Sequence, residues 1–174
     1  MTTFKHFSLS LLAAMTAFAY PLVTQAAVYS NGSKVASFDV TLTIVADCIV
    51  STAGALDFGQ NQGMLSAVVS STSNINVTCT DTTPYNLGLS AGSGAGSNGT
   101  TRYLSGTGGN TGTVRVNLYQ TAGTTLWGNT QGTDTVANVG NGAQVTHTVY
   151  GEIPAQSTPA PDSYKSTITA TVYF

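Results

Sequence analysis

The stretch that decides the fold is V-A-S-F-D-V-T-L-T-I-V, residues 35–45. Apolar and polar side chains alternate along most of it, which is the period-two pattern of a half-buried β-strand. The apolar set is Phe38, Val40, Leu42 and Ile44, and the polar set is Asp39, Thr41 and Thr43. A strand with one apolar face must cover a sheet. This stretch can complete the sheet of its own domain or the sheet of another chain.

The residues before this stretch have the layout of a secretory signal peptide. Lys5 and His6 supply a positive start, and residues 7–20 form an apolar run. The run is shorter than the roughly 18 apolar residues that a membrane span needs. Small residues up to Ala26 suit cleavage. We therefore expect residues 1–26 to be removed on export to the periplasm, with no stable membrane insertion afterwards and one mature domain.

The composition excludes several function classes. The chain has 174 residues with only 5 Lys and Arg against 7 Asp and Glu, and it contains 19 glycines. So few basic residues cannot form the positive patch that neutralises phosphates, and nucleic acid is therefore not an expected partner. Thr, Val, Tyr and Phe favour strands, whereas Gly and Asn favour turns, so the composition predicts an all-β fold.

Further segments alternate in the same way, with glycine, asparagine or proline between them. The clearest are residues 75–79, 114–119 and 164–174, whereas the facing of residues 144–153 is mixed. Asn141-Gly142 predicts a β-hairpin whose second strand is residues 144–153. Many short strands of this kind predict a β-sandwich.

Cys48 and Cys79 are the two cysteines of the chain. In an exported protein an even pair is expected to form a disulfide. A metal centre would need more ligands than two thiols. The single histidine of the mature chain, His147, is expected on a strand surface. No metal site and no cofactor are therefore predicted.

The end of the sequence predicts an open sheet edge. Residues 164–174 alternate up to the last residue, Phe174, so we expect no following strand to pair with them. An uncovered edge invites association with another strand. The alternating stretch 38–44 can supply that strand to another chain, which is β-augmentation. The alternative is that this stretch pairs in its own domain and completes the sandwich.

Four segments taken together carry a family resemblance. They are F-D-V-T-L-T-I-V-A-D-C at 38–48, L-D-F-G at 56–59, I-N-V-T-C at 75–79 and Y-K-S-T-I-T-A-T-V-Y-F at 164–174. In this order they resemble the spore coat protein U domain family, which includes the subunits of Csu-type pili built by the archaic chaperone–usher pathway. Ser166 departs from the pattern, because the family often has an acidic residue there.

The resemblance implies an incomplete immunoglobulin-like β-sandwich, residues 48–174, that lacks its last strand. A periplasmic chaperone is expected to lend a strand first. At the outer-membrane usher, the N-terminal segment of the next pilin subunit, residues 27–47 here, is expected to replace it. The implied donor residues are Phe38, Val40, Leu42 and Ile44. The implied acceptor and chaperone contacts are Ile168, Val172 and Phe174. Cys48 and Cys79 match the disulfide of the family.

The function implied is a structural pilus subunit that polymerises by donor-strand exchange into surface filaments for adhesion and biofilm formation. The alternative is a tip adhesin or a free secreted carbohydrate-binding module. For that alternative, Trp127 with Tyr103 and Tyr119 could form an aromatic surface on which a sugar stacks, although such aromatics more often pack in a core. An enzyme is not expected, because His147 lacks a nucleophile motif and the carboxylates are scattered along the chain.

Overall fold

The computed structural model describes residues 31–52, 54–60 and 64–174. The signal peptide expected at residues 1–26 lies outside these ranges. The chain divides into two units, Met1–Thr41 and Leu42–Phe174. Among the described residues, no helix has the length and apolar character required to cross a membrane.

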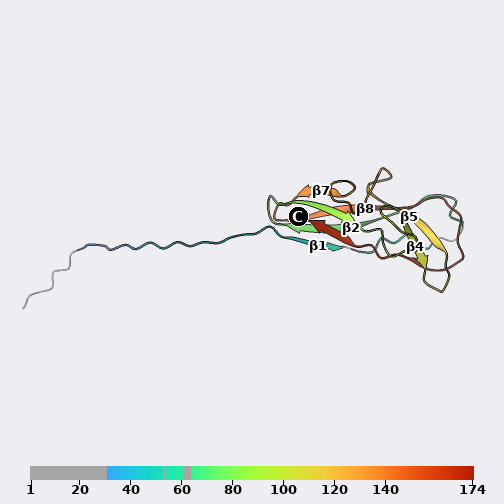
Figure 1. Cartoon of the computed structure of the whole chain (residues 1–174), viewed down its shortest axis with the longest axis horizontal. Helices are drawn as coiled ribbons and strands as arrows, with labels where there is room; N and C mark the ends of the chain where they lie inside the picture. Colours follow the sequence, from blue (N-terminus) through green and yellow to red (C-terminus); the bar gives the residue numbers. More distant parts are fainter. Residues whose placement is uncertain (1–30, 53, 61–63) are drawn as a thin grey trace, which may run out of the picture. The chain divides into compact units, whose positions relative to one another are not determined.

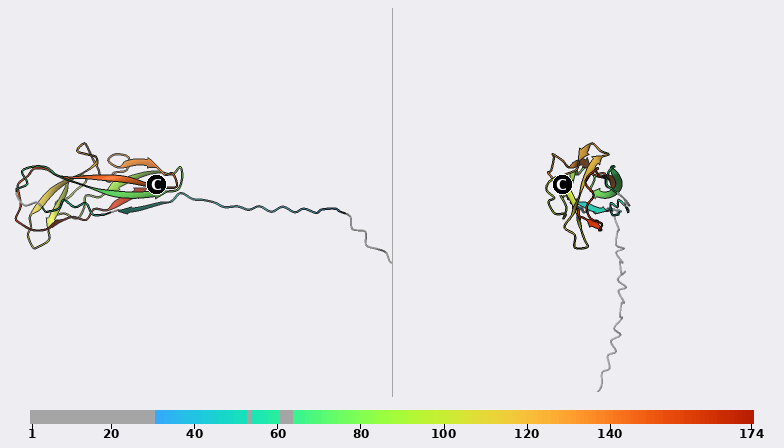
Figure 2. Two further views of the ribbon diagram at one scale, coloured as in Figure 1. Left: turned by 180° about the vertical axis from the view of Figure 1, so that it is seen from behind. Right: turned by 90° about the vertical axis from the view of Figure 1, so that its right-hand side faces the viewer.

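The larger unit is a sandwich of two antiparallel β-sheets (Figure 1). The strands of the first sheet, in spatial order, are β1 (Cys48–Thr52), β2 (Val69–Cys79), β8 (Gln144–Ile153), β5 (Thr113–Thr121), β4 (Arg102–Gly106) and β9 (Tyr164–Lys165), and β6 (Thr125–Leu126) pairs with β5. The strands of the second sheet are β10 (Ala170–Tyr173), β3 (Pro84–Leu89) and β7 (Val136–Val139). Figure 2 shows the sandwich from behind, where the long strands β2 and β8 run side by side.

The alternation in the sequence places the core as expected. In β2, Ile75 and Val77 are buried, whereas Asn74 is exposed and Asn76 is half-buried. In β5, Val114, Val116 and Leu118 are buried in the same alternating way. The predicted all-β sandwich is therefore confirmed. The period of two determines which side chains of each strand point into the core.

The turn at Asn141-Gly142 joins the two sheets, so the predicted hairpin is wrong. The strand before it, β7, pairs with β3, whereas the strand after it, β8, pairs with β2 and β5. Gly142 has the positive φ of 73° that its position in a tight turn requires. The neighbouring Gly140 donates its N–H to Thr83 O and accepts the N–H of Thr82. These bonds hold the turn against the connection between β2 and β3. The chain then continues into β8 of the first sheet.

Two side chains donate hydrogen bonds to carbonyl groups at the end of β3, where its pairing with β7 stops. Pairing between β3 and β7 stops at Leu87. The indole N–H of Trp127 donates to Leu87 O at 2.8 Å, and Nη2 of Arg102 donates to Leu89 O at 2.8 Å. Arg102 also donates from Nη2 to Trp127 O and from Nε to Ser90 O. Because Arg102 belongs to β4, its guanidinium ties the first sheet to the second.

The disulfide predicted between Cys48 and Cys79 is present. It joins the first residue of β1 to the last residue of β2, and these two residues are register partners. The two cysteines are 31 residues apart in the sequence. The bond therefore anchors the edge strand β1 at the point where the chain joins the sandwich.

We expect the double substitution Cys48→Ala and Cys79→Ala to lower the free energy of unfolding by about 3–4 kcal/mol, because the bond restricts a loop of this length in the unfolded chain. Urea unfolding of the monomer measures the loss. The reduced parent protein is the control and should show the same midpoint as the double variant. A double variant as stable as the oxidised parent contradicts the prediction.

Candidate functional site

The terminal segment, residues 163–173, is paired along only one edge within the described residues. Ser93 donates its N–H to Thr167 O at 3.1 Å, and Ser90 donates its N–H to Thr169 O at 2.9 Å. On either side of these bonds, β9 pairs with β4 and β10 pairs with β3. Both β9 and β10 end the order of their sheets. No strand of the described part of the chain pairs with the other edge of the segment, although β1 lies close to β10.

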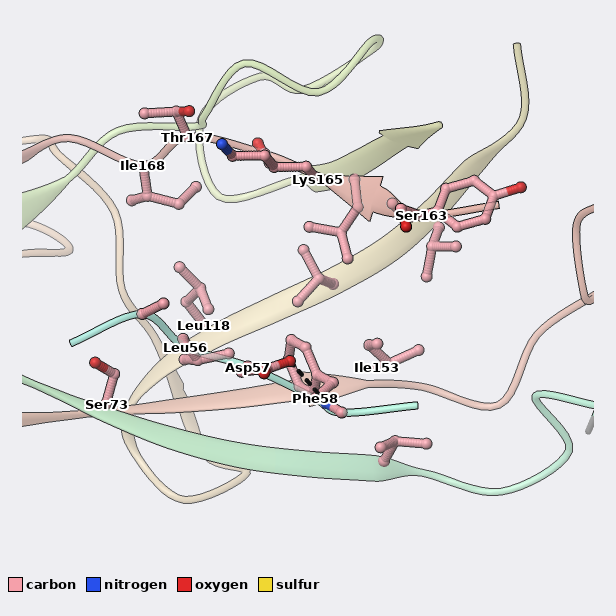
Figure 3. Close-up of a pocket in the computed structure, with 18 of the residues that line it drawn as sticks. Leu56, Asp57, Phe58, Ser73, Leu118, Ile153, Ser163, Lys165, Thr167 and Ile168 are labelled. Atoms are coloured by element: carbon pink, nitrogen blue, oxygen red, sulfur yellow. Dashed lines mark hydrogen bonds between the residues drawn. The ribbon is translucent and has the colours of Figure 1, made fainter. Parts of the chain in front are cut away.

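A long groove, which we call the acceptor groove, follows this open edge (Figure 3). One wall is the terminal segment from 163 to 168 together with Ala170, and the opposite wall is the segment 54–60. Its volume is about 1370 Å³, whereas small-molecule sites typically measure about 300–1,000 Å³. Its apolar floor includes Leu104, Val114, Val116, Leu118, Val149 and Ile153.

Side chains of the terminal segment alternate between the groove and the surface. Ile168 points toward Leu56 and Leu118, whereas Thr167 points away from them (Figure 3). The half-buried residues of the segment that pack against the core are Tyr164, Ile168, Ala170 and Val172. An added strand on this edge would place its own apolar side chains over the same core.

The opposite wall, residues 54–60, is held by side chains and is not a strand. Ser73 Oγ donates to Gly54 O at 2.8 Å, and Ser71 Oγ donates to the carbonyl of Asp57. Leu56 and Phe58 pack over Gly151 of β8, where an added Cβ would lie 2.7 Å from Leu56 and 3.0 Å from Phe58. Gly151 therefore makes room for this wall of the groove.

The stretch 38–44 forms no strand, and its four apolar side chains are exposed. The exposed fractions are 85% for Phe38, 87% for Val40, 85% for Leu42 and 76% for Ile44. Large apolar side chains exposed in series mark an interaction surface on a soluble protein. The donor role of these residues stays a prediction, because their partner would be another chain.

The three residues predicted as acceptor contacts lie in different surroundings. Ile168 lines the groove. Val172 packs against the core but does not line the groove, and Phe174 is 59% exposed. Sequence reasoning did not assign Tyr164, Ala170, Leu56 and Phe58 to the site. The alternation of residues 164–174 and the L-D-F-G motif are the signals that could have found them.

The comparison with protein families decides which family this sandwich represents. The model of the Spore Coat Protein U domain matches residues 34–171, which include both the exposed stretch 38–44 and the groove. The chain belongs to the spore coat protein U domain family. No curated protein matches the chain.

Two solved structures are similar to this spore coat protein U domain. The first is the CsuC–CsuE chaperone–tip adhesion subunit pre-assembly complex from archaic chaperone–usher Csu pili of Acinetobacter baumannii, with a TM-score of 0.54 and 20% identity over 76% of this chain. The match spans 40% of that chain, and it shows a shared immunoglobulin-like fold. The second is HdaB, the minor tip subunit of the E. coli Hda pilus, with a TM-score of 0.37 and 17% identity over 72% of this chain and 79% of that chain.

His147 of this spore coat protein U domain lies between the sheets, so its predicted place on a strand surface is wrong. Its Nε2 lies 2.8 Å from the hydroxyl of Tyr85, and the two rings are nearly perpendicular. Burial lowers the pKa of His147 below its usual 6.5. Burial also raises the pKa of Tyr85, against the effect of a hydrogen bond with Asn138. The pair bridges β8 of the first sheet and β3 of the second.

We expect the domain to lose stability as the pH falls below about 6.5, the pKa of an unfolded histidine. The folded pKa of His147 is lower, so stability is complete above the unfolded pKa and decreases as the pH falls toward the folded pKa. The slope is at most about 1.4 kcal/mol per pH unit for one such group. Urea unfolding of the parent and of His147→Gln across this range measures it. If the free energy of unfolding changed with pH equally in the two proteins, groups other than His147 would be responsible for the pH dependence.

The structure of this spore coat protein U domain also bears on the sugar-stacking surface and on metal binding. Trp127 is 1% exposed and packs in the core, so it cannot form a sugar-stacking surface with Tyr103 and Tyr119. Within the described ranges, no three His, Cys, Asp or Glu residues are grouped so that they could hold a metal ion.

Proposed function

We propose that this chain is a structural subunit of a pilus and that it polymerises by donating its N-terminal strand to another copy. The observation that carries the proposal is the apolar acceptor groove beside the unpaired edge of the terminal segment (Figure 3). Residues 38–44 of a second copy present exposed apolar side chains at the period of a strand.

The groove and the donor stretch match in length and in character. Residues 38–44 span seven residues, and the even-numbered positions of the terminal segment that line the groove, from Tyr164 to Ala170, also span seven. Both stretches alternate with period two. A strand added to this edge would form backbone hydrogen bonds along its whole length, and its apolar side chains would give specificity.

Burial of the four donor side chains would stabilise each joint by roughly 6–12 kcal/mol before the costs of ordering the strand. The backbone hydrogen bonds add to this. A joint of this strength dissociates slowly, because differences in affinity appear mostly in the dissociation rate. Slow dissociation is what a filament outside the cell requires.

The partners follow from the same groove. An apolar groove of this size is an aggregation hazard in a free monomer, so we propose that a periplasmic chaperone covers it before assembly. An outer-membrane usher would then exchange the chaperone strand for the strand of the next subunit. The product would be a surface filament for adhesion and biofilm formation. The donor stretch favours a shaft subunit over a tip adhesin, because a tip subunit needs no donor strand.

The test is to produce the full chain with a chaperone of this class and to compare heated and unheated samples in SDS gels. We expect an unheated ladder of multimers that resolves to monomer on boiling. A synthetic peptide of residues 35–47 should shorten the ladder by capping free grooves. The control peptide carries Val40→Asp and Leu42→Asp and should have no effect. A single monomer band that neither peptide changes would contradict the proposal.

A further inference from the structure

We propose that the donor strand of a second copy lies antiparallel to the terminal segment in one defined register. The four cross-strand pairs in the groove are Phe38–Ala170, Val40–Ile168, Leu42–Ser166 and Ile44–Tyr164. This inference rests on the proposed function and deepens it, because it assigns each donor side chain to a position in the groove.

The alternation of both strands restricts the register to steps of two residues. Residues directly opposite each other on paired strands point to the same face of the sheet. The apolar donor residues have even numbers, and the residues of the terminal segment that pack on the core also have even numbers. Only pairings of even with even residues bury the apolar face of the donor.

The extent of the groove selects one register among these. At its even-numbered positions the terminal segment lines the groove with Tyr164, Ser166, Ile168 and Ala170, but not with Val172 or Phe174. Asp162 also lines the groove, but its carboxylate accepts the N–H groups of Gly108 and Ser163, so four positions of the terminal segment remain for the four apolar donor residues.

Slips in either direction fit less well. A slip of two residues toward Phe174 would place Phe38 opposite Val172, outside the groove lining. A slip the other way would place Ile44 opposite Asp162, whose carboxylate accepts the N–H groups of Gly108 and Ser163.

Side-chain size is also complementary in this register. The smallest lining residues of the terminal segment, Ala170 and Ser166, lie opposite Phe38 and Leu42. The β-branched Val40 lies opposite Ile168, and Ile44 lies opposite Tyr164. Large residues that alternate with small ones across facing positions fill a core without voids.

The position of β1 selects the antiparallel direction. Asp47 accepts the N–H of Thr80 at the start of β1, and β2 ends nearby at Cys79. The end of β10 lies at the same end of the sandwich, because Tyr173 pairs with Asn86 near the start of β3.

In a parallel arrangement, Ile44 of the incoming copy would lie opposite Ala170. Its Cys48, about 13 Å further along an extended chain, would then lie beside Phe174. The incoming sandwich would then begin at the end where the acceptor's own chain enters β1, so the two would compete for the same space. In the antiparallel arrangement, the incoming sandwich follows beyond Tyr164, at the opposite end.

Disulfide trapping in the full chain tests the register. Thr43 and Lys165 are both exposed, and they lie opposite each other in the proposed pairing. The odd-numbered residues of the terminal segment direct their backbone groups away from the open edge, as the bonds of Thr167 and Thr169 show. Thr43 and Lys165 would therefore be a non-hydrogen-bonded pair, whose side chains are close enough for a disulfide.

The test variant combines Thr43→Cys with Lys165→Cys and is assembled under mild oxidation, with the native disulfide verified by peptide mapping. Three control variants combine Thr43→Cys with Ser163→Cys, Thr167→Cys or Thr169→Cys. We expect a boiling-resistant, reductant-sensitive ladder with a yield at least about fivefold higher for the test variant. The reason is that diagonal neighbours lie about 7–8 Å apart, beyond disulfide reach.

The possible results separate this inference from the proposed function. A ladder strongest in a control variant overturns the register and leaves the function standing. A cross-linked monomer from the Thr43–Lys165 variant shows that the strand closes its own sheet, which overturns both. Absence of any multimer, covalent or not, in the parent and in all variants contradicts the proposed function itself.

Discussion

Val40→Asp is expected to abolish assembly of the chain into multimers, whereas Thr41→Asp, the same change one residue along, is expected to leave assembly intact. The physical reason is the alternation of the donor strand. Position 40 would face the apolar floor of the groove, where a carboxylate has no partner, and position 41 would face water. Burial of an unpaired charge costs about 3–5 kcal/mol, which weakens each joint by about 10²–10⁴-fold.

Unheated SDS gels and negative-stain electron microscopy of both variants measure this effect. Export and folding of each variant are checked by the yield of its complex with the chaperone, which neither substitution should change. If Val40→Asp assembles as the parent does, residues 38–44 are not the donor strand. If Thr41→Asp also fails, the facing of the strand is wrong.

Arg102→Met is expected to destabilise the sandwich by about 3–5 kcal/mol, the largest effect that we predict for a single residue outside the donor strand. Arg102 is fully buried and donates to the carbonyls of Leu89, Ser90 and Trp127. Burial lowers the pKa of Arg102 to about 10, against the effect of Asp134. The guanidinium therefore stays charged at neutral pH. Methionine would fill much of the space but would leave three buried carbonyls without donors.

The matched control is Arg115→Met, because Arg115 is exposed on β5 and its side chain makes no hydrogen bond within the described residues. A substitution at such a surface position should change stability by no more than about 0.5 kcal/mol. Urea unfolding of both variants is measured in the Val40→Asp background with the groove filled by the synthetic peptide of residues 35–47, which keeps polymerisation out of the measurement. Equal stability of the two variants would show that Arg102 does not hold the sheets together.

The strands that bury one face could be predicted from the sequence because their pattern is local. Period two in residues 75–79 and 114–119 depends only on neighbouring residues, and the structure confirms these strands within β2 and β5. The disulfide was predictable because the chain has only two cysteines and its first 26 residues predict export. The open edge of the terminal segment was predictable from its unbroken alternation.

The features that the sequence did not reveal depend on contacts between distant residues. Arginine is rarely buried, so no local pattern predicts that Arg102 would supply the donors that β3 lacks beyond Leu87. Asn141-Gly142 specifies a tight turn, but the hydrogen bonds of Gly140 determine that the turn crosses between the sheets. His147 follows the alternation of β8 inward, and only its contact with Tyr85 on the other sheet explains a polar side chain there.

The central claim is that the sandwich lacks a strand and that residues 35–47 of another copy supply it. Native mass spectrometry tests this claim most directly, on a mature chain that lacks residues 27–44 and is produced with a periplasmic chaperone. We predict a one-to-one complex with the chaperone that does not polymerise and that exchanges the chaperone for one synthetic peptide of residues 35–47. A stable monomer that folds without the chaperone and binds no peptide would contradict the account, because its sandwich would be complete without the donor strand.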